Sequence, residues 1–191
     1  MQKKHLLKKY KIQIPLNINV IYISNKKIII LSNLMSQKLL KLSVQILINK
    51  LKKTIYISQI LFSKFVNKRL AASFQGTDTA LIKQNILELF IIFYQKLKFV
   101  GVGYRVFNIN NFKNQILLFK VGYSHFLYFK IIQNITVFNS KTIKLFLFGK
   151  NYQNLKQMLF LIRSFKKPEP YKGKGILDYN EKILLKKIKK N

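Results

Sequence analysis

The residues whose types and spacing best suit a defined chemistry lie in one stretch, residues 163–176, which reads RSFKKPEPYKGKGI. Pro168 and Pro170 stop a preceding helix and keep the chain extended, because proline fixes its own φ and disfavours helical backbone in the residue before it. Gly173 and Gly175 permit positive φ angles and the close approach of another backbone. The stretch is therefore expected to be a rigid loop that leaves a helix.

The side chains of this loop are suited to RNA. Tyr171 offers an aromatic face on which a base or a sugar can rest, and it is surrounded by four basic residues, Lys166, Lys167, Lys172 and Lys174. A rigid, basic, glycine-spaced loop favours binding to irregularly folded RNA. The plainer alternative is a solvated surface loop with incidental lysines.

The whole chain of 191 residues is strongly basic, with 36 Lys and Arg against 5 Asp and Glu and a formal net charge of +31. A compact fold with this charge repels itself, and a polyanion such as nucleic acid or an anionic membrane surface relieves the repulsion. Three of the basic residues are arginines, and Ile, Asn, Phe, Tyr and Lys dominate the rest. This bias is typical of an AT-rich coding sequence.

Residues for catalysis are scarce. Cysteine is absent, which excludes disulfides, thiolate catalysis and cysteine-ligated zinc, and the two histidines, His5 and His125, have no acidic residue nearby in sequence. The pair Gly101 and Gly103 lacks the third glycine and the following helix of a nucleotide-binding loop, and glycines in a bent strand explain it better. We expect no enzymatic activity, no small-molecule substrate, no cofactor and no metal.

Hydrophobic patterning predicts the elements that position the loop. In the first half, residues 20–24 and 28–31 form a hairpin, further short strands follow at 39–42, 44–48 and 54–57, and a helix carries an apolar stripe of Ile82, Ile86, Leu89 and Phe93. In the second half, strands are expected at 99–107, 115–121, 126–131 and 143–148, and a helix is expected around Leu155, Met158, Leu159 and Ile162.

Two features bear on the packing of these elements. The expected core of the second half consists of apolar residues from its strands and helix: Phe99, Val100, Val102, Leu118, Val121, Leu145, Leu147, Leu155, Leu159 and Ile162. Lys-Thr-Ile occurs at 53–55 and again at 141–143, each time before an expected helix, ending at Ser73-Phe74 and at Ser164-Phe165. A repeat of about 90 residues predicts two similar domains in tandem.

Several segments together resemble a known family. The run 167–176 (KPEPYKGKGI) resembles the C-terminal signature of the bacterial-type large-subunit ribosomal protein six family. Residues 97–105 (LKFVGVGYR) resemble its first strand of the second domain, and 121–125 (VGYSH) its Gly-aromatic-Ser-His turn. Gly76-Thr77 resembles its Gly-Thr helix start, but Thr79 stands where the family usually has Arg, so an RNA or bracing contact there is lost or moved to Lys83.

The resemblance implies an α+β fold of two tandem related domains, each an antiparallel sheet packed with helix, with residues 1–92 as the first domain, 93–180 as the second and 181–191 as a basic tail. It implies a structural constituent of the large ribosomal subunit that binds large-subunit rRNA, mainly through the second domain, near the sarcin–ricin loop and the stalk base. Other large-subunit ribosomal proteins would be neighbours, and translational GTPases would dock transiently nearby. The RNA-binding residues expected from the loop and the matched segments are Arg105, Ser124, His125, Arg163, Lys166, Lys167, Tyr171, Lys172, Gly173, Lys174 and Gly175.

Two alternatives stay open, a basic peripheral membrane-surface protein and a non-ribosomal RNA-binding protein. The lysine-rich start, Met1 to Lys11, lacks the apolar core of a signal peptide, and the longest apolar run is too short for a membrane span. The AT-rich composition, the bacterial-type signature and the lack of an import sequence predict an organelle-encoded protein of the mitochondrial matrix. A plastid or a bacterial cytoplasm is the alternative location.

Overall fold

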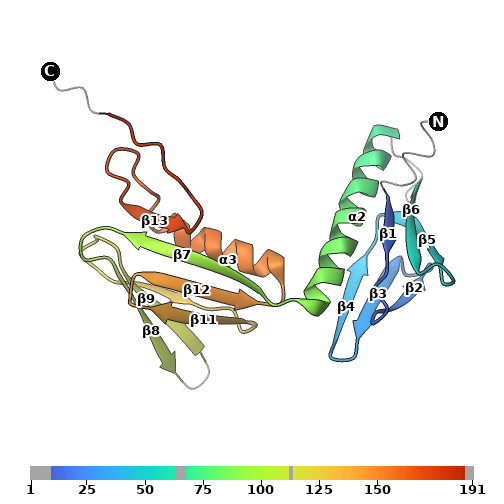
Figure 1. Ribbon diagram of the computed structural model, residues 1–191, viewed down its shortest axis with the longest axis horizontal. Coiled ribbons are helices and arrows are strands. Elements are labelled where there is room, and N and C mark those ends of the chain that lie inside the picture. The colour runs from blue at the N-terminus through green and yellow to red at the C-terminus, as the bar shows by residue number, and fades with distance from the viewer. Residues whose placement is uncertain (1–9, 63–67, 112–113, 188–191) are drawn as a thin grey trace. The chain divides into compact units, whose positions relative to one another are not determined.

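The computed structural model (Figure 1) describes residues 10–62, 68–111 and 114–187. Most of the expected N-terminal basic arm and the last residues of the basic tail lie outside the described residues. The chain divides into two compact units, Met1–Ile91 and Ile92–Asn191. In the described residues each unit combines antiparallel sheets with a helix, so the α+β fold with two related domains is confirmed.

The described residues of the N-terminal unit form six strands and a long helix, which are β1 (Lys11–Gln13), β2 (Asn19–Ile23), β3 (Ile28–Asn33), β4 (Ser36–Lys41), β5 (Val44–Asn49), β6 (Thr54–Leu61) and α2 (Lys68–Phe90). The strands form two antiparallel sheets of order β1-β6-β5 and β2-β3-β4. The predicted hairpin is confirmed, because Ile23 pairs with Ile28 across its turn. Ile82, Ile86 and Leu89 of α2 are buried in the core of this unit, but Phe93 lies beyond the helix in the next strand.

The expected start of this helix at Gly76-Thr77 is wrong. Both residues lie inside α2, eight residues or more after its first residue, Lys68. The Thr77 hydroxyl donates to the carbonyl of Phe74, 2.9 Å away, as hydroxyls inside helices do, rather than capping a new helix. The same helix runs through Ser73-Phe74, where the first repeat was expected to end its helix.

In the C-terminal unit the structure describes seven strands and a helix, which are β7 (Phe93–Val100), β8 (Arg105–Asn111), β9 (Asn114–Lys120), β10 (Leu127–Lys130), β11 (Ile135–Ser140), β12 (Lys144–Gly149), α3 (Tyr152–Ser164) and β13 (Gly175–Asp178). They form a sheet of order β10-β9-β8 and a four-stranded sheet of order β11-β12-β7-β13, and every pairing is antiparallel. In Figure 1, α3 runs along the four-stranded sheet. The strand expected over 99–107 is in fact two strands, because a turn at 101–104 interrupts it.

The core of the C-terminal unit lies between α3 and the two sheets. The predicted helical stripe is confirmed, since Leu155, Met158, Leu159 and Ile162 are all buried, and Asn151 caps the helix by accepting hydrogen bonds from two backbone N–H groups. The core prediction is wrong for Val102, which is 90% exposed in the glycine turn. It is also wrong for Val100 and Leu118, which are partly exposed because the neighbouring residues of their strands face the core.

The internal repeat has a structural counterpart. Lys53 and Lys141 both adopt positive φ, 44° and 53°, in the turns that precede β6 and β12. Each of these strands is then followed in the chain by the helix of its unit. The two Lys-Thr-Ile segments therefore occupy equivalent places in the two units.

Candidate nucleic-acid interface

The predicted loop leaves α3 at Phe165 and returns to the sheet at β13. Phe165 anchors its start in the core, with its ring centroid 5.6 Å from that of Phe119 and 5.7 Å from that of Phe129. The base of the loop is closed by the N–H of Ile176, which donates to the carbonyl of Lys166 at 2.9 Å. The loop is thus fixed at both ends to the packed interior.

The backbone of the loop is also bonded within itself. The N–H of Glu169 donates to the carbonyl of Lys174, and the N–H of Gly173 donates to the carbonyl of Glu169, both at 2.9 Å. The N–H of Lys186, from the segment after β13, donates to the carbonyl of Pro170 at 3.0 Å. These bonds make the rigid loop that the prolines and glycines predict.

Both glycines of the loop serve the roles expected of them. Gly173 has φ +67°, the left-handed conformation that favours glycine. A Cβ atom on Gly175, which has φ +150°, would lie 2.5 Å from Cα of Pro168 and 2.9 Å from the carbonyl oxygen of Lys167. Only glycine lets the loop pass this close to the first residue of β13.

A second segment, the turn at 122–125, lies against the start of this loop. The Tyr123 hydroxyl donates to the carbonyl of Phe165 at 3.1 Å. The ring of Tyr123 stacks on that of His125 with centroids 5.8 Å apart, and Nζ of Lys166 lies 4.5 Å from the Tyr123 centroid. The Gly-aromatic-Ser-His motif and the basic loop therefore form one surface.

The glycine turn at 101–103 lies against the turn at 122–125. The Tyr104 ring connects them, because a Cβ atom on Gly101 would lie 2.8 Å from this ring and one on Gly122 would lie 3.1 Å from it. Arg105 follows directly as the exposed first residue of β8. The turn 122–125 thus lies between the loop on one side and the glycine turn on the other, which brings three segments distant in sequence next to one another.

The predicted residues differ in what they offer to a ligand. Arg105, Ser124, His125, Lys167, Tyr171 and Lys172 are exposed, whereas Lys166, Gly173 and Lys174 are partly buried. Gly175 is buried, so it shapes the loop and offers no contact surface. The Arg163 guanidinium forms an ion pair with Glu181, which occupies one side of its donor fork.

Sequence reasoning missed Tyr123 as a member of this surface. Its ring is exposed, touches His125 and Lys166, and its hydroxyl fixes the turn to the loop. The available signal was its place inside the motif that supplied Ser124 and His125. An aromatic residue flanked by lysine and histidine is a suitable stacking partner for a base.

The position that departs from the family pattern lies in the N-terminal unit. Thr79 is buried, and its hydroxyl donates to the carbonyl of Gln75 one helical turn earlier. Asp78 beside it is also buried, and its carboxylate accepts hydrogen bonds from the N–H groups of Ser43 (2.8 Å) and Val44 (3.1 Å) at the start of β5. Both side chains are therefore structural in this chain, while Lys83 is exposed.

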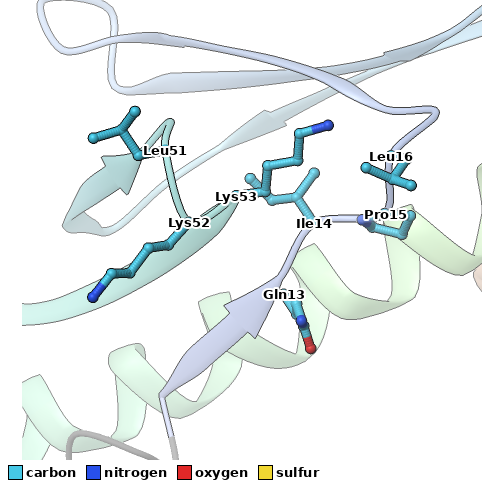
Figure 2. A pocket seen from close by; sticks show the side chains of 7 residues that line it. All are labelled: Gln13, Ile14, Pro15, Leu16, Leu51, Lys52 and Lys53. Carbon is cyan, nitrogen blue, oxygen red and sulfur yellow. The ribbon is translucent and has the colours of Figure 1, made fainter.

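The N-terminal unit also carries a surface hollow of about 650 Å³, lined by Gln13, Ile14, Pro15, Leu16, Leu51, Lys52 and Lys53. Figure 2 shows the Lys52 side chain extending away from Ile14 and Pro15, so the polar groups do not converge on one point.

Within the described ranges, no group of three or more His, Asp or Glu side chains is placed to hold a metal. No helix in those ranges is both long and apolar enough to cross a membrane.

The segments that form this surface lie in a part of the sequence that matches a known protein family. Residues 100–179, which include the loop and both turns, match the sequence model of ribosomal protein L6. The large ribosomal subunit protein uL6 of Nautilia profundicola is 37% identical over 128 residues, which are 67% of this chain and 69% of the relative. That of Buchnera aphidicola from Acyrthosiphon pisum is 34% identical over 133 residues, 70% of this chain and 73% of the relative.

The chain belongs to the ribosomal protein L6 family. The resemblance inferred from the sequence motifs is therefore confirmed. The relatives reported above are named as proteins of the large ribosomal subunit, and residues suited to catalysis are scarce in the sequence of this chain. The part of this chain that matches the L6 family model is nearly the whole C-terminal unit, from the end of β7 to just past β13.

Proposed function

We propose that this chain is a structural component of the large ribosomal subunit and binds large-subunit rRNA mainly through its C-terminal unit. The contact surface comprises the loop 166–174 together with the turn 122–125 and Arg105. The observation that carries the proposal is the convergence of these segments, because each supplies a cation, a polar side chain or an exposed ring to one surface.

Binding on this surface follows from its chemistry. Lysine and arginine side chains neutralise phosphates and release counterions, which supplies most of the affinity. The exposed ring of Tyr171 stacks on a base or sugar, and the fixed outline of the loop selects an irregular RNA shape. The hydrogen bonds that hold the loop before binding reduce the ordering entropy that binding would otherwise cost.

The place of this contact in the subunit is proposed from the family resemblance. The rRNA segment is expected near the sarcin–ricin loop and the stalk base, so translational GTPases dock transiently nearby and other large-subunit proteins are neighbours. We propose that the ribosome is that of a mitochondrion, which the AT-rich composition supports. The relatives named above are bacterial, which fits the alternative of a bacterial cytoplasm.

Reconstitution of the subunit with variants of this protein tests the proposal. Tyr171→Ala is expected to lower the affinity for the large-subunit rRNA about tenfold, because stacking on one base is lost, and Gly173→Val is expected to weaken incorporation by straining the loop at φ +67°. Tyr128→Ala, which removes an exposed ring from β10, is the matched control and should have little effect. Equal losses in the Tyr171 and Tyr128 variants would refute the assignment of the loop as the main site.

A further inference from the structure

The outer face of the four-stranded sheet β11-β12-β7-β13 is not used by the loop. Side chains of a strand alternate between its two faces, and Leu97, Phe99, Leu145 and Leu147 point to the core shared with α3. The side chains between them point the other way. Together with Tyr179, which directly follows β13, they provide five aromatic residues, here called the aromatic platform, which are Tyr94, Phe138, Phe146, Phe148 and Tyr179.

The strand register arranges these outward side chains in rows across the sheet. One row contains Phe148 and Tyr94, which are direct partners on β12 and β7. The next row contains Phe138, Phe146 and Lys96, paired across β11, β12 and β7. Tyr179 extends this second row, because its N–H donates to the carbonyl of Lys96 at 3.1 Å.

The rings of the platform form a continuous surface that remains exposed. The ring centroids of Tyr94 and Phe148 are 6.3 Å apart, those of Phe148 and Phe146 are 6.5 Å apart, and those of Phe146 and Phe138 are 6.2 Å apart. Three of the five residues keep more than half of their surface exposed, namely Tyr94 (64%), Phe138 (60%) and Tyr179 (54%). Exposed aromatic residues in such number on one sheet indicate a binding surface.

The charges on this face are all positive. Nζ of Lys96 lies 3.5 Å from the ring centroid of Tyr179 and 5.1 Å from that of Phe146, which is a cation–π arrangement. Lys98 and Lys144 are direct partners on β7 and β12, and both are exposed. Like charges opposite each other destabilise a sheet, and a phosphate between them would remove this repulsion. No outward position of these four described strands carries an acidic residue.

From this arrangement we propose that the aromatic platform is a second RNA site, which stacks unpaired bases of a single strand while Lys98 and Lys144 hold its phosphates. Neighbouring rows of side chains on the sheet are two residues apart along each β-strand, a separation of about 7 Å. One single-stranded RNA can therefore stack its bases on the aromatic rings while its phosphates contact the adjacent row of lysines. The positive charge favours RNA over an apolar protein segment as the occupant. The site lies beyond the proposed loop contact and uses none of its residues.

Fluorescence anisotropy with the full chain tests this proposal. The probes are a labelled short oligouridine and a labelled strand of equal length whose sugars carry no bases, compared at one fixed salt concentration. The wild-type protein is expected to bind the oligouridine about tenfold more tightly than the abasic strand, because only bases can stack.

A double variant, Tyr94→Leu with Phe138→Leu, removes two exposed rings but keeps most of the apolar area. It is expected to lose the preference for oligouridine and to keep its affinity for the abasic strand, whereas the control Tyr128→Leu should retain both. A protein-docking face would instead give no preference in the wild-type chain. That result, or a preference that survives in the double variant, overturns the proposal.

Ultraviolet crosslinking of the oligouridine to the wild-type protein gives a second readout that needs no variant. Crosslinked peptides are expected to contain Tyr94, Phe138 or Tyr179. Crosslinks confined to the loop around Tyr171 would overturn the platform site and leave the loop contact standing. Unchanged rRNA binding in the Tyr171→Ala variant together with platform crosslinks would overturn the loop contact and leave the platform site standing, so the two proposals are separable.

Discussion

Gly175→Ala is expected to release the loop 166–174 from the sheet. A Cβ atom on Gly175 would lie 2.5 Å from Cα of Pro168 and 2.8 Å from its nitrogen. Carbon atoms prefer separations of about 3.5–4.0 Å, so the loop must retreat by roughly 1 Å or more. Both obstructing atoms belong to the backbone, which cannot rotate aside as a flexible side chain can.

The free-energy cost has two parts. Overpacking costs about 1–3 kcal/mol, and a non-glycine residue at φ +150° costs about 1–3 kcal/mol more. The total of roughly 2–6 kcal/mol is a large part of the stability of a typical domain, about 5–15 kcal/mol. The matched control is Gly103→Ala, because Gly103 also has a positive φ, +74°, but a Cβ atom there would have no atom within 4 Å. This variant therefore has the backbone strain without the overpacking.

Amide hydrogen exchange followed by mass spectrometry measures the effect. The N–H of Ile176, which bonds to Lys166, is expected to lose about thirtyfold or more of its protection in Gly175→Ala, since each 1.4 kcal/mol is tenfold. Peptides from α2 in the N-terminal unit should be unchanged and serve as an internal control. If Gly175→Ala behaves like Gly103→Ala, the close approach of loop and strand plays no part in holding the loop.

Three further outcomes follow from the same structure. Gly76→Ala should stabilise the N-terminal unit by about 0.5–1 kcal/mol in thermal unfolding, because Gly76 lies inside α2 and its Cβ would meet no atom; a lower melting temperature would contradict this. Asp78→Ala should destabilise that unit by about 3 kcal/mol in urea unfolding, because the N–H groups of Ser43 and Val44 lose a charged acceptor; a loss below about 1 kcal/mol would show that water replaces it. The rRNA affinity should fall with salt at a log–log slope of about −6 to −7 if roughly eight phosphates are neutralised. Lys172→Ala should make that slope shallower by about one, and an unchanged slope would remove this lysine from the contact.

The sequence alone was sufficient for features with a local cause. The four buried residues of α3 follow helical periodicity, and the loop after it follows from Pro168, Pro170 and the two glycines. The positive φ of Gly173 and the close approach at Gly175 are backbone demands that only glycine meets, so residue type was enough to predict them.

Features that depend on distant partners could not be predicted in this way. No strand is expected over 175–178 from the sequence, because β13 has only four residues and its partner Phe99 is far away in the chain. The alternation of apolar and other residues predicts a strand over 143–148. Which face of that strand remains exposed cannot be predicted in this way, because it depends on α3 covering the opposite face of the sheet. The start of α2 at Lys68 was missed because its first turn carries no acidic residue and Gly76-Thr77 offered a false signal.

The hydrophobic pattern of the sequence also does not predict the buried polar groups of the N-terminal unit. Asp78 and Glu88 are two of the five acidic residues in the chain, and no sequence pattern assigns either of them a buried partner. Instead Asp78 accepts from the β5 backbone, and Glu88 pairs with Lys38 of β4 at 2.8 Å. Scarce carboxylates are thus used inside this unit, which leaves its exposed charge almost entirely positive.

The most direct test of the central claim is gradient sedimentation of a lysate, with and without magnesium chelation, following this protein by mass spectrometry. The account predicts that it sediments with the large subunit after chelation separates the subunits, and that the Tyr171→Ala variant is depleted from that peak. A protein that stays at the top of the gradient, or floats with membranes, would contradict its assignment to the large ribosomal subunit.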